Sequence, residues 1–211
     1  MTYAILKNNF RFQIMKKRTV ITLCSLAIAT FLLSATIRKS SSGAPASHTG
    51  APGEKTCATS GCHDDTTPNI GTAQLSLELG DHESTFIPGQ TYPVRVKITD
   101  PKINRFGFQI LALESKSLKD MGSFQISDSA RTQIVSNMYE LKNRKYVTYT
   151  FDGTDAIYEG CGEWIVNWTA PTDVKKGVTF YVAAVSGNDD MSDKGDKVYT
   201  ANYSFKPANR K

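Results

Sequence analysis

Short runs of alternating apolar and polar residues fill the chain from residue 74 onward, with turn residues between them. In the run 92–99, apolar side chains occupy every second position from Tyr92 to Ile98, and Arg95 falls between them. A period of two is typical of a strand that buries one face. The nine runs that we predict as strands are 74–79, 92–99, 106–113, 123–126, 133–137, 146–151, 163–168, 178–185 and 198–205.

Turn residues separate these runs, at 87–90, 152–153, 170–173 and 175–177. No helical period of useful length and no internal repeat appears in this part of the chain. The number and spacing of the runs predict an all-β sandwich over residues 74–206, followed by a short basic tail at 207–211.

Trp164 and Trp168 are four positions apart in one predicted strand, so both fall on the same face as Val166. Paired tryptophans on one strand face are usually core residues. We therefore predict that they anchor the core and do not form an exposed binding platform.

The first 46 residues read as an export signal. Three basic residues, Lys16 to Arg18, precede an apolar run at 20–37 and a stretch of small polar residues at 40–47. This order is typical of a secretory signal peptide, with an uncleaved signal anchor helix as the alternative. We expect an exported protein that is periplasmic, on the outer surface or secreted, and that contacts a membrane only if the leader is retained.

Charge is distributed unevenly along the chain. The leader holds 7 of the 25 Lys and Arg residues and none of the 20 Asp and Glu residues, so the remainder carries 18 basic against 20 acidic side chains. The predicted domain therefore has no basic surface of the kind that binds nucleic acid. No nucleophile is recognisably paired with a base, and we expect a protein that is not an enzyme.

An irregular segment at 47–73 carries the most informative motif. Residues 57–63 read CATSGCH, which places two thiols ahead of an adjacent histidine. This is the order of c-type haem attachment, although four residues separate the cysteines where two are usual. It predicts haem c, with Cys57 and Cys62 as the thioether residues and His63 as an axial iron ligand, in electron transfer or redox sensing with an unknown redox partner.

Three other interpretations of this motif remain open. Cys57 and Cys62 can close a disulfide in an oxidising compartment, which leaves a non-catalytic domain that binds an unknown extracellular ligand. They can also form a metal site with His63 and Asp64 or Asp65. His63 can also be an exposed loop residue with no role.

Several further positions bear on these alternatives. Cys161 is expected as a free thiol, or as the partner of a motif cysteine if haem is absent. The carboxylates of 187–196 suggest calcium only weakly, because their spacing does not match an EF-hand loop. The motif does not specify a second axial ligand, for which the candidates are His48, His82, Met121, Met138 and Met191.

Four stretches resemble the framework of a known family: 86–92 (FIPGQTY), 106–109 (FGFQ), 164–171 (WIVNWTAP) and 177–180 (GVTF). They are similar to reelin-type (Reeler, choice-of-anchor) domains of secreted Bacteroidetes proteins. The resemblance spans about residues 74–206 and implies an immunoglobulin-like sandwich that works outside the cell, with no shared active site. The stretch 49–54 (TGAPGE) resembles the segment that precedes cytochrome c-like CxxCH sites in the same group.

Overall fold

A computed structural model describes residues 43–208. The predicted leader lies outside this range except for its last four positions, and the basic tail except for its first two. Within the described range, no helix is both long and apolar enough to cross a bilayer.

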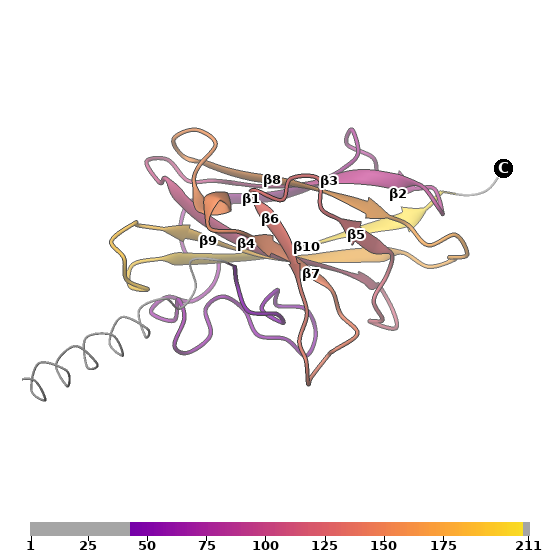
Figure 1. The fold of residues 1–211 in the computed structure, drawn as a ribbon, viewed down its shortest axis with the longest axis horizontal. Coiled ribbons are helices and arrows are strands. Elements are labelled where there is room, and N and C mark those ends of the chain that lie inside the picture. Colours follow the sequence, from indigo (N-terminus) through magenta and orange to yellow (C-terminus); the bar gives the residue numbers. More distant parts are fainter. Residues whose placement is uncertain (1–42, 209–211) are drawn as a thin grey trace, which may run out of the picture. The chain divides into compact units, whose positions relative to one another are not determined.

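The described residues form ten strands in two sheets (Figure 1). All paired neighbours are antiparallel except β2 and β10, which run parallel. The four-stranded sheet has the order β1 (Gln74–Leu79), β3 (Thr91–Thr99), β8 (Cys161–Thr169) and β5 (Ser123–Gln125). The six-stranded sheet has the order β2 (Thr85–Phe86), β10 (Lys197–Pro207), β9 (Val178–Gly187), β4 (Arg105–Glu114), β7 (Tyr146–Tyr149) and β6 (Thr132–Val135).

The predicted all-β, immunoglobulin-like sandwich is confirmed, and each of the nine predicted strands is present. The sequence analysis missed β2, which has only two residues, and the 3-10 turn η1 (Asp152–Thr154). A two-residue strand is too short to show alternation. Its formation depends on pairing with the far end of β10, through Lys206 and Pro207.

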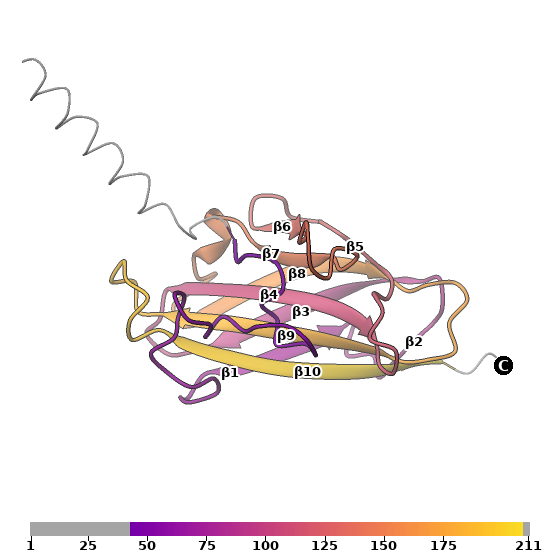
Figure 2. The same ribbon diagram turned by 90° about the horizontal axis from the view of Figure 1, so that it is seen from below.

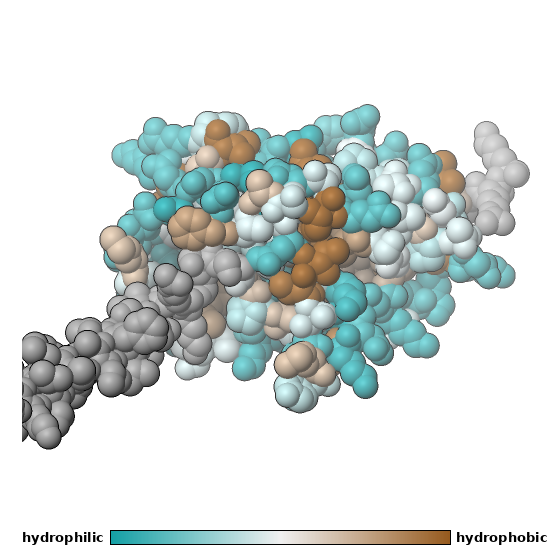
Figure 3. Space-filling view, in the orientation of Figure 1, coloured by the Kyte–Doolittle hydropathy of each residue, from teal (hydrophilic) through white to brown (hydrophobic). Residues whose placement is uncertain are grey.

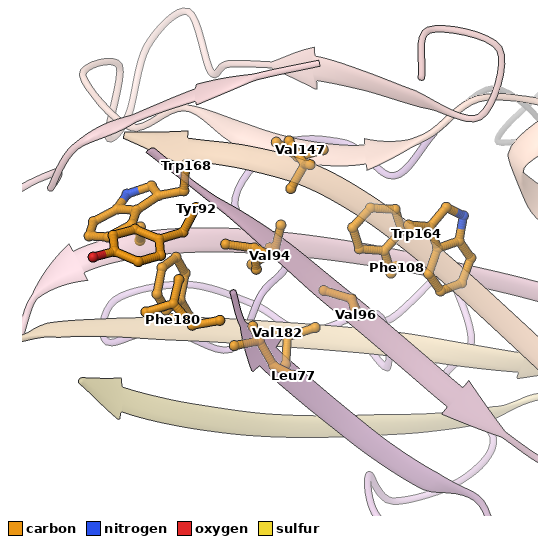
Figure 4. Close-up of a cluster of buried hydrophobic side chains, with 14 of the residues drawn as sticks. Leu77, Tyr92, Val94, Val96, Phe108, Val147, Trp164, Trp168, Phe180 and Val182 are labelled. Atoms are coloured by element: carbon orange, nitrogen blue, oxygen red, sulfur yellow. The ribbon is translucent and has the colours of Figure 1, made fainter. Parts of the chain in front are cut away.

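The core lies between the two sheets and contains both tryptophans, as predicted (Figure 4). Trp164 stacks on Phe108 with ring centroids 4.4 Å apart, and Trp168 meets Phe180 edge-on at 5.1 Å. Each indole N–H donates to a buried backbone carbonyl, at 2.8 Å for Trp164 and 2.9 Å for Trp168. Each ring thus adds apolar area to the core without leaving a buried donor unpaired.

The central strands of the six-stranded sheet are buried on both faces. In β4, Phe108 and Ile110 point into the core, whereas Leu111 and Leu113 belong to a second cluster on the outer face. Strand β9 follows the same pattern. A strand covered on one face only would expose every second side chain, so another part of the chain must cover the outer face.

That cover is the irregular segment that precedes β1. Residues 43–63, which we call the strap, lie along the outer face, and Figure 2 shows this dark, N-terminal part of the chain crossing in front of β4 and β9. Ala51 of the strap packs in the cluster of Leu111 and Leu113. The segment is irregular, as predicted, but it is packed on the sheet and does not hang free as a tether.

Candidate functional site

A buried glutamine of β4 holds the beginning of the strap. Gln109 points to the outer face and is completely buried. Its Oε1 accepts a hydrogen bond of 2.8 Å from the backbone N–H of His48, and its Nε2 donates to the carbonyl of Pro45, also at 2.8 Å. Because a buried amide needs partners for both its donor and its acceptor, the strap is fixed in register at His48.

A buried ion pair holds the turn of the strap. The side chain of Glu54 is fully buried, and its Oε1 accepts hydrogen bonds from Arg144 at 2.5 Å and from the Tyr146 hydroxyl at 2.8 Å. Its Oε2 accepts a hydrogen bond of 2.5 Å from the hydroxyl of Thr49. The threonine and glutamate of the TGAPGE stretch therefore lock the segment just before the cysteines onto the sheet.

Cys57 is the buried centre of the motif. Its side chain packs with Ala183, Val185 and Val198 of β9 and β10 and is only 6% exposed. Burial, together with the nearby thiol of Cys62, raises the pKa of Cys57 to about 12. A thiol with this pKa is protonated and unreactive at neutral pH.

Cys62 is half-buried and ends a tight turn that starts at Thr56. The backbone N–H of Thr59 donates to Thr56, and that of Cys62 donates to Thr59 at 2.9 Å. Ser60 and Gly61 are exposed, so the extra residues of the motif loop outward. Cys57, Cys62 and Cys161 are free thiols in the described part of the chain.

His63 directly follows Cys62 and contacts the end of the loop between β9 and β10. Its Nδ1 lies 2.7 Å from Oδ2 of Asp196, whose side chain is 7% exposed. This nitrogen makes no well-aligned hydrogen bond, so the contact is a close electrostatic pair between the ring edge and the carboxylate. The contact holds the Nδ1 edge of the ring against the end of this loop.

The two residues after His63 fasten the same loop. Asp64 pairs with Lys194 at 3.0 Å, and Asp65 accepts a hydrogen bond of 2.7 Å from the backbone N–H of Gly195. The N–H of Gly61 and the ammonium of Lys194 lower the pKa of Asp64. The motif and the loop between β9 and β10 are thus joined by three successive contacts.

A shallow pocket of about 220 Å³ opens beside His63. Phe106, Tyr149 and Phe151 contribute aromatic surface to it, and Asp196 contributes charge. Burial raises the pKa of Tyr149, and so do the charges of Cys57 and Cys62. His63 thus borders an aromatic pocket that neither motif cysteine lines.

The alternative metal sites find no support among residues 43–208, where no group of three or more His, Cys, Asp or Glu side chains is arranged to hold a metal ion. Asp64 and Asp65 are engaged by Lys194 and Gly195. In the loop considered for calcium, Asp189 pairs with Arg105 at 3.0 Å, and the other carboxylates bind groups of the loop or of the motif.

Cys161 lies apart from the motif in the fold. It is completely buried at the start of β8, where it pairs with Thr99 in the four-stranded sheet. Cys57, in contrast, packs on the outer face of the six-stranded sheet. Cys161 is a free thiol and not the disulfide partner of a motif cysteine, which was the other expectation.

The sequence matches no protein-family model and no curated protein. Among solved structures, the chain is similar to the Reelin-N domain of F-spondin, with a TM-score of 0.49 and 20% identity over 70% of this chain and 95% of that chain. The human F-spondin reeler domain gives a TM-score of 0.49 and 21% identity, over 67% of this chain and 94% of that chain. A cohesin module of a Clostridium perfringens family 33 glycoside hydrolase gives a TM-score of 0.43 and 9% identity, over 65% of this chain and 96% of that chain.

The first two of these structures are of the reelin type that the sequence resembles. At these identities and TM-scores, the similarity does not assign the chain to a family or identify a function.

Proposed function

We propose that the chain is an exported, non-enzymatic protein that carries haem c on the outer face of its six-stranded sheet and transfers electrons or senses redox state at the cell envelope. Cys57 and Cys62 hold the haem and His63 ligates its iron. The observation that carries this proposal is the close pair of His63 Nδ1 with Asp196, at 2.7 Å. Histidines that ligate metals almost always present their other ring nitrogen to a carboxylate, a backbone carbonyl or water.

The donor atoms of the motif, two thiols and an imidazole nitrogen, are those that hold haem c. Cys57 and Cys62 would hold the haem through thioether bonds, which form when each S–H adds across a vinyl group and which need no oxidant. His63 would be the iron ligand, with the Nδ1 edge of its ring beside Asp196. When bound, a haem provides one-electron chemistry, and the chain sets its potential through the axial ligand, hydrogen bonds and burial.

The size of the pocket beside His63 determines how far a bound haem would be exposed to solvent. At about 220 Å³ it is smaller than the pockets of about 300–1,000 Å³ that enclose drug-sized ligands. It therefore cannot enclose a macrocycle, and a group held here stays open to solvent on its outer side. An exposed edge suits exchange of electrons with a protein partner.

The burial of Cys57 limits when its thiol can react. A thiol that is 6% exposed and has a pKa of about 12 cannot react from within the packed strap. Attachment at Cys57 therefore requires that the strap be off the sheet.

A second candidate function is a non-catalytic domain that binds an extracellular ligand and has Cys57 and Cys62 in a disulfide. The fold of the motif favours it, because the backbone N–H of His63 donates to the carbonyl of Cys57 at 3.1 Å and so brings the two ends of the motif together. A disulfide between them would close a small loop and contribute about 2 kcal/mol by the chain-entropy relation.

The experiment that separates the two functions uses protein exported in a host with c-type cytochrome maturation machinery. Wild type, Cys57→Ala/Cys62→Ala and the matched control Cys161→Ala are compared by haem staining after denaturing electrophoresis and by reduced absorption spectra. We expect covalent haem and an α-band in wild type and Cys161→Ala, and neither in the double variant. Colourless wild type, with the thiols at 57 and 62 resistant to alkylation until reduction, would leave the disulfide-bearing binding domain.

A further inference from the structure

A second pocket, of about 280 Å³, opens at the side of the sandwich where β5 and β6 form the edges of their two sheets. Figure 3 shows a group of hydrophobic residues in the middle of the drawn face, in the region where Figure 1 draws β5, β6 and β7. The pocket shares no lining residue with the one beside His63. A ligand held here is therefore independent of the proposed function.

Inward-facing residues of the two edge strands make the walls of this pocket apolar. Phe124 of β5 pairs with Trp168, a residue of the core. Ile134 of β6 pairs with Val147, which also belongs to the core. Residues directly opposite each other in antiparallel strands lie on the same face of a sheet, so Phe124 and Ile134 both face inward. Each strand ends its sheet in the described chain, which leaves Phe124 half-buried and Ile134 42% exposed.

The inner part of the pocket is formed by Ala112 and Met121, which are buried in the core. Met121 donates its backbone N–H to the carbonyl of Ala112 at 3.0 Å, and its own carbonyl accepts the indole N–H of Trp168 at 2.9 Å. The next residue, Gly122, has a φ of +78°, and a Cβ there would lie 2.4 Å from Nε1 of Trp168, so the position requires glycine. These contacts fix the pocket in the folded chain before any ligand is present.

Asp120 and Lys145 add one charge of each sign to the lining. Partial burial raises the pKa of Asp120 to about 6, which outweighs the opposing effects of the Lys145 backbone N–H and of the charges of Arg144 and Lys145. The carboxylate has thus lost part of its hydration, and a cation that enters the pocket offsets that loss. Lys145 is exposed, and a lysine of this kind keeps its ammonium group in water. The pocket therefore favours a cation over an anion.

We propose that this pocket binds a small organic amine, whose ammonium group pairs with Asp120 and whose apolar body packs on Phe124 and Ile134. The volume of about 280 Å³ is just below the range of about 300–1,000 Å³ that encloses drug-sized ligands, so the amine is smaller than those. A primary amine on a short aromatic or branched alkyl chain, such as 2-phenylethylamine, has this chemistry. A ligand of this size binds with a Kd on the order of 1 mM.

The test follows the methyl NMR signals of Ala112, Met121 and Ile134 while 2-phenylethylamine is added to the purified, exported protein. These signals should shift and saturate, and the neutral 2-phenylethanol should bind about tenfold more weakly, because it cannot make a charged hydrogen bond to Asp120. Wild type whose three signals stay unchanged at about 10 mM amine would overturn the proposal. Covalent haem at the cysteine motif, present or absent, leaves this result unaffected, so the test is separate from that of the proposed function.

Three variants test the charges. Asp120→Asn, at an exposed residue, keeps the size of the side chain and should reduce amine binding to the level of the alcohol. Lys145→Met should strengthen amine binding, because it removes a repelling charge and keeps an apolar stem. Asp81→Asn, at an exposed residue in the turn after β1, is the matched control and should bind as wild type does. Unchanged binding in Asp120→Asn, or tighter binding of 3-phenylpropionate than of the amine, would overturn the assignment of an amine.

Discussion

Arg144 donates a hydrogen bond of 2.5 Å to Glu54, and this pair joins the turn of the strap to the residues just before β7. Neither side chain is more than 9% exposed. Breaking a buried ion pair from one side leaves a charge without compensation, which costs far more than losing a surface pair. The position of the cysteine motif therefore depends on a contact made before the motif begins.

Replacing Glu54 by alanine should lower the free energy of unfolding by about 3 kcal/mol, because Arg144 keeps its charge in a buried position. Urea unfolding of the apo protein measures this change, and limited proteolysis should cut within residues 43–63 of the variant first. The exposed Glu159 supplies the control, Glu159→Ala, with a change below about 0.5 kcal/mol. Equal losses in the two variants would contradict the role of Glu54.

The stability of the apo protein should fall at alkaline pH because of Cys57. Its pKa is about 12 in the folded state against 9.0 for an ordinary thiol, so the unfolded chain releases the proton first. The stabilisation is complete below pH 9 and is lost as the pH rises toward 12, with a slope of up to about 1.4 kcal/mol per pH unit. Unfolding of reduced wild type and Cys57→Ala between pH 8 and 11 should give curves that diverge; parallel curves would contradict the burial of the thiol.

The two motif thiols should differ in their reaction with an alkylating reagent. In reduced apo protein at pH 8, the half-buried Cys62 should react first and Cys57 only when the strap opens. Glu54→Ala should accelerate the reaction of Cys57 about 100-fold, if the full 3 kcal/mol acts on strap opening. Mass spectrometry of the labelled peptides gives both rates, and equal rates at the two cysteines of wild type would refute the packed strap.

Asp196→Asn should keep the haem but change its electronic properties. The substitution removes the charge beside His63 Nδ1 and retains an oxygen for the N–H of Asn188. A less basic imidazole should weaken the bond to iron by about 10- to 100-fold and raise the midpoint potential. Redox titration measures the shift, with Asp193→Asn in the same loop as control, since its side chain is 44% exposed. An unchanged potential in Asp196→Asn would mean that the pair only closes the loop.

Local pattern was enough to predict nine of the ten strands and the core. The alternation in 92–99 and the shared face of Trp164 and Trp168 are properties of neighbouring residues, and both carry over directly into the fold. The strap could not be predicted in this way, because Gln109 and Arg144 hold it from positions far along the chain. One signal was available: 106–113 is apolar at almost every position, which is typical of a strand covered on both faces.

The candidate site was predicted in part. Cys57, Cys62 and His63 follow from the order of the motif, and the structure brings them together at one face of the sheet. Asp196 was considered only as a residue of a solvated, calcium-like loop, because its pairing with His63 depends on how that loop folds back.

The most direct test of the central claim is mass spectrometry of the exported wild-type protein, intact and after proteolysis, from a host with cytochrome c maturation machinery. The account predicts that the peptide containing Cys57 and Cys62 carries the mass of one haem and that neither thiol can be alkylated after reduction. The same peptide without added mass, with both thiols alkylated only after reduction, would contradict it and identify a disulfide in place of the haem.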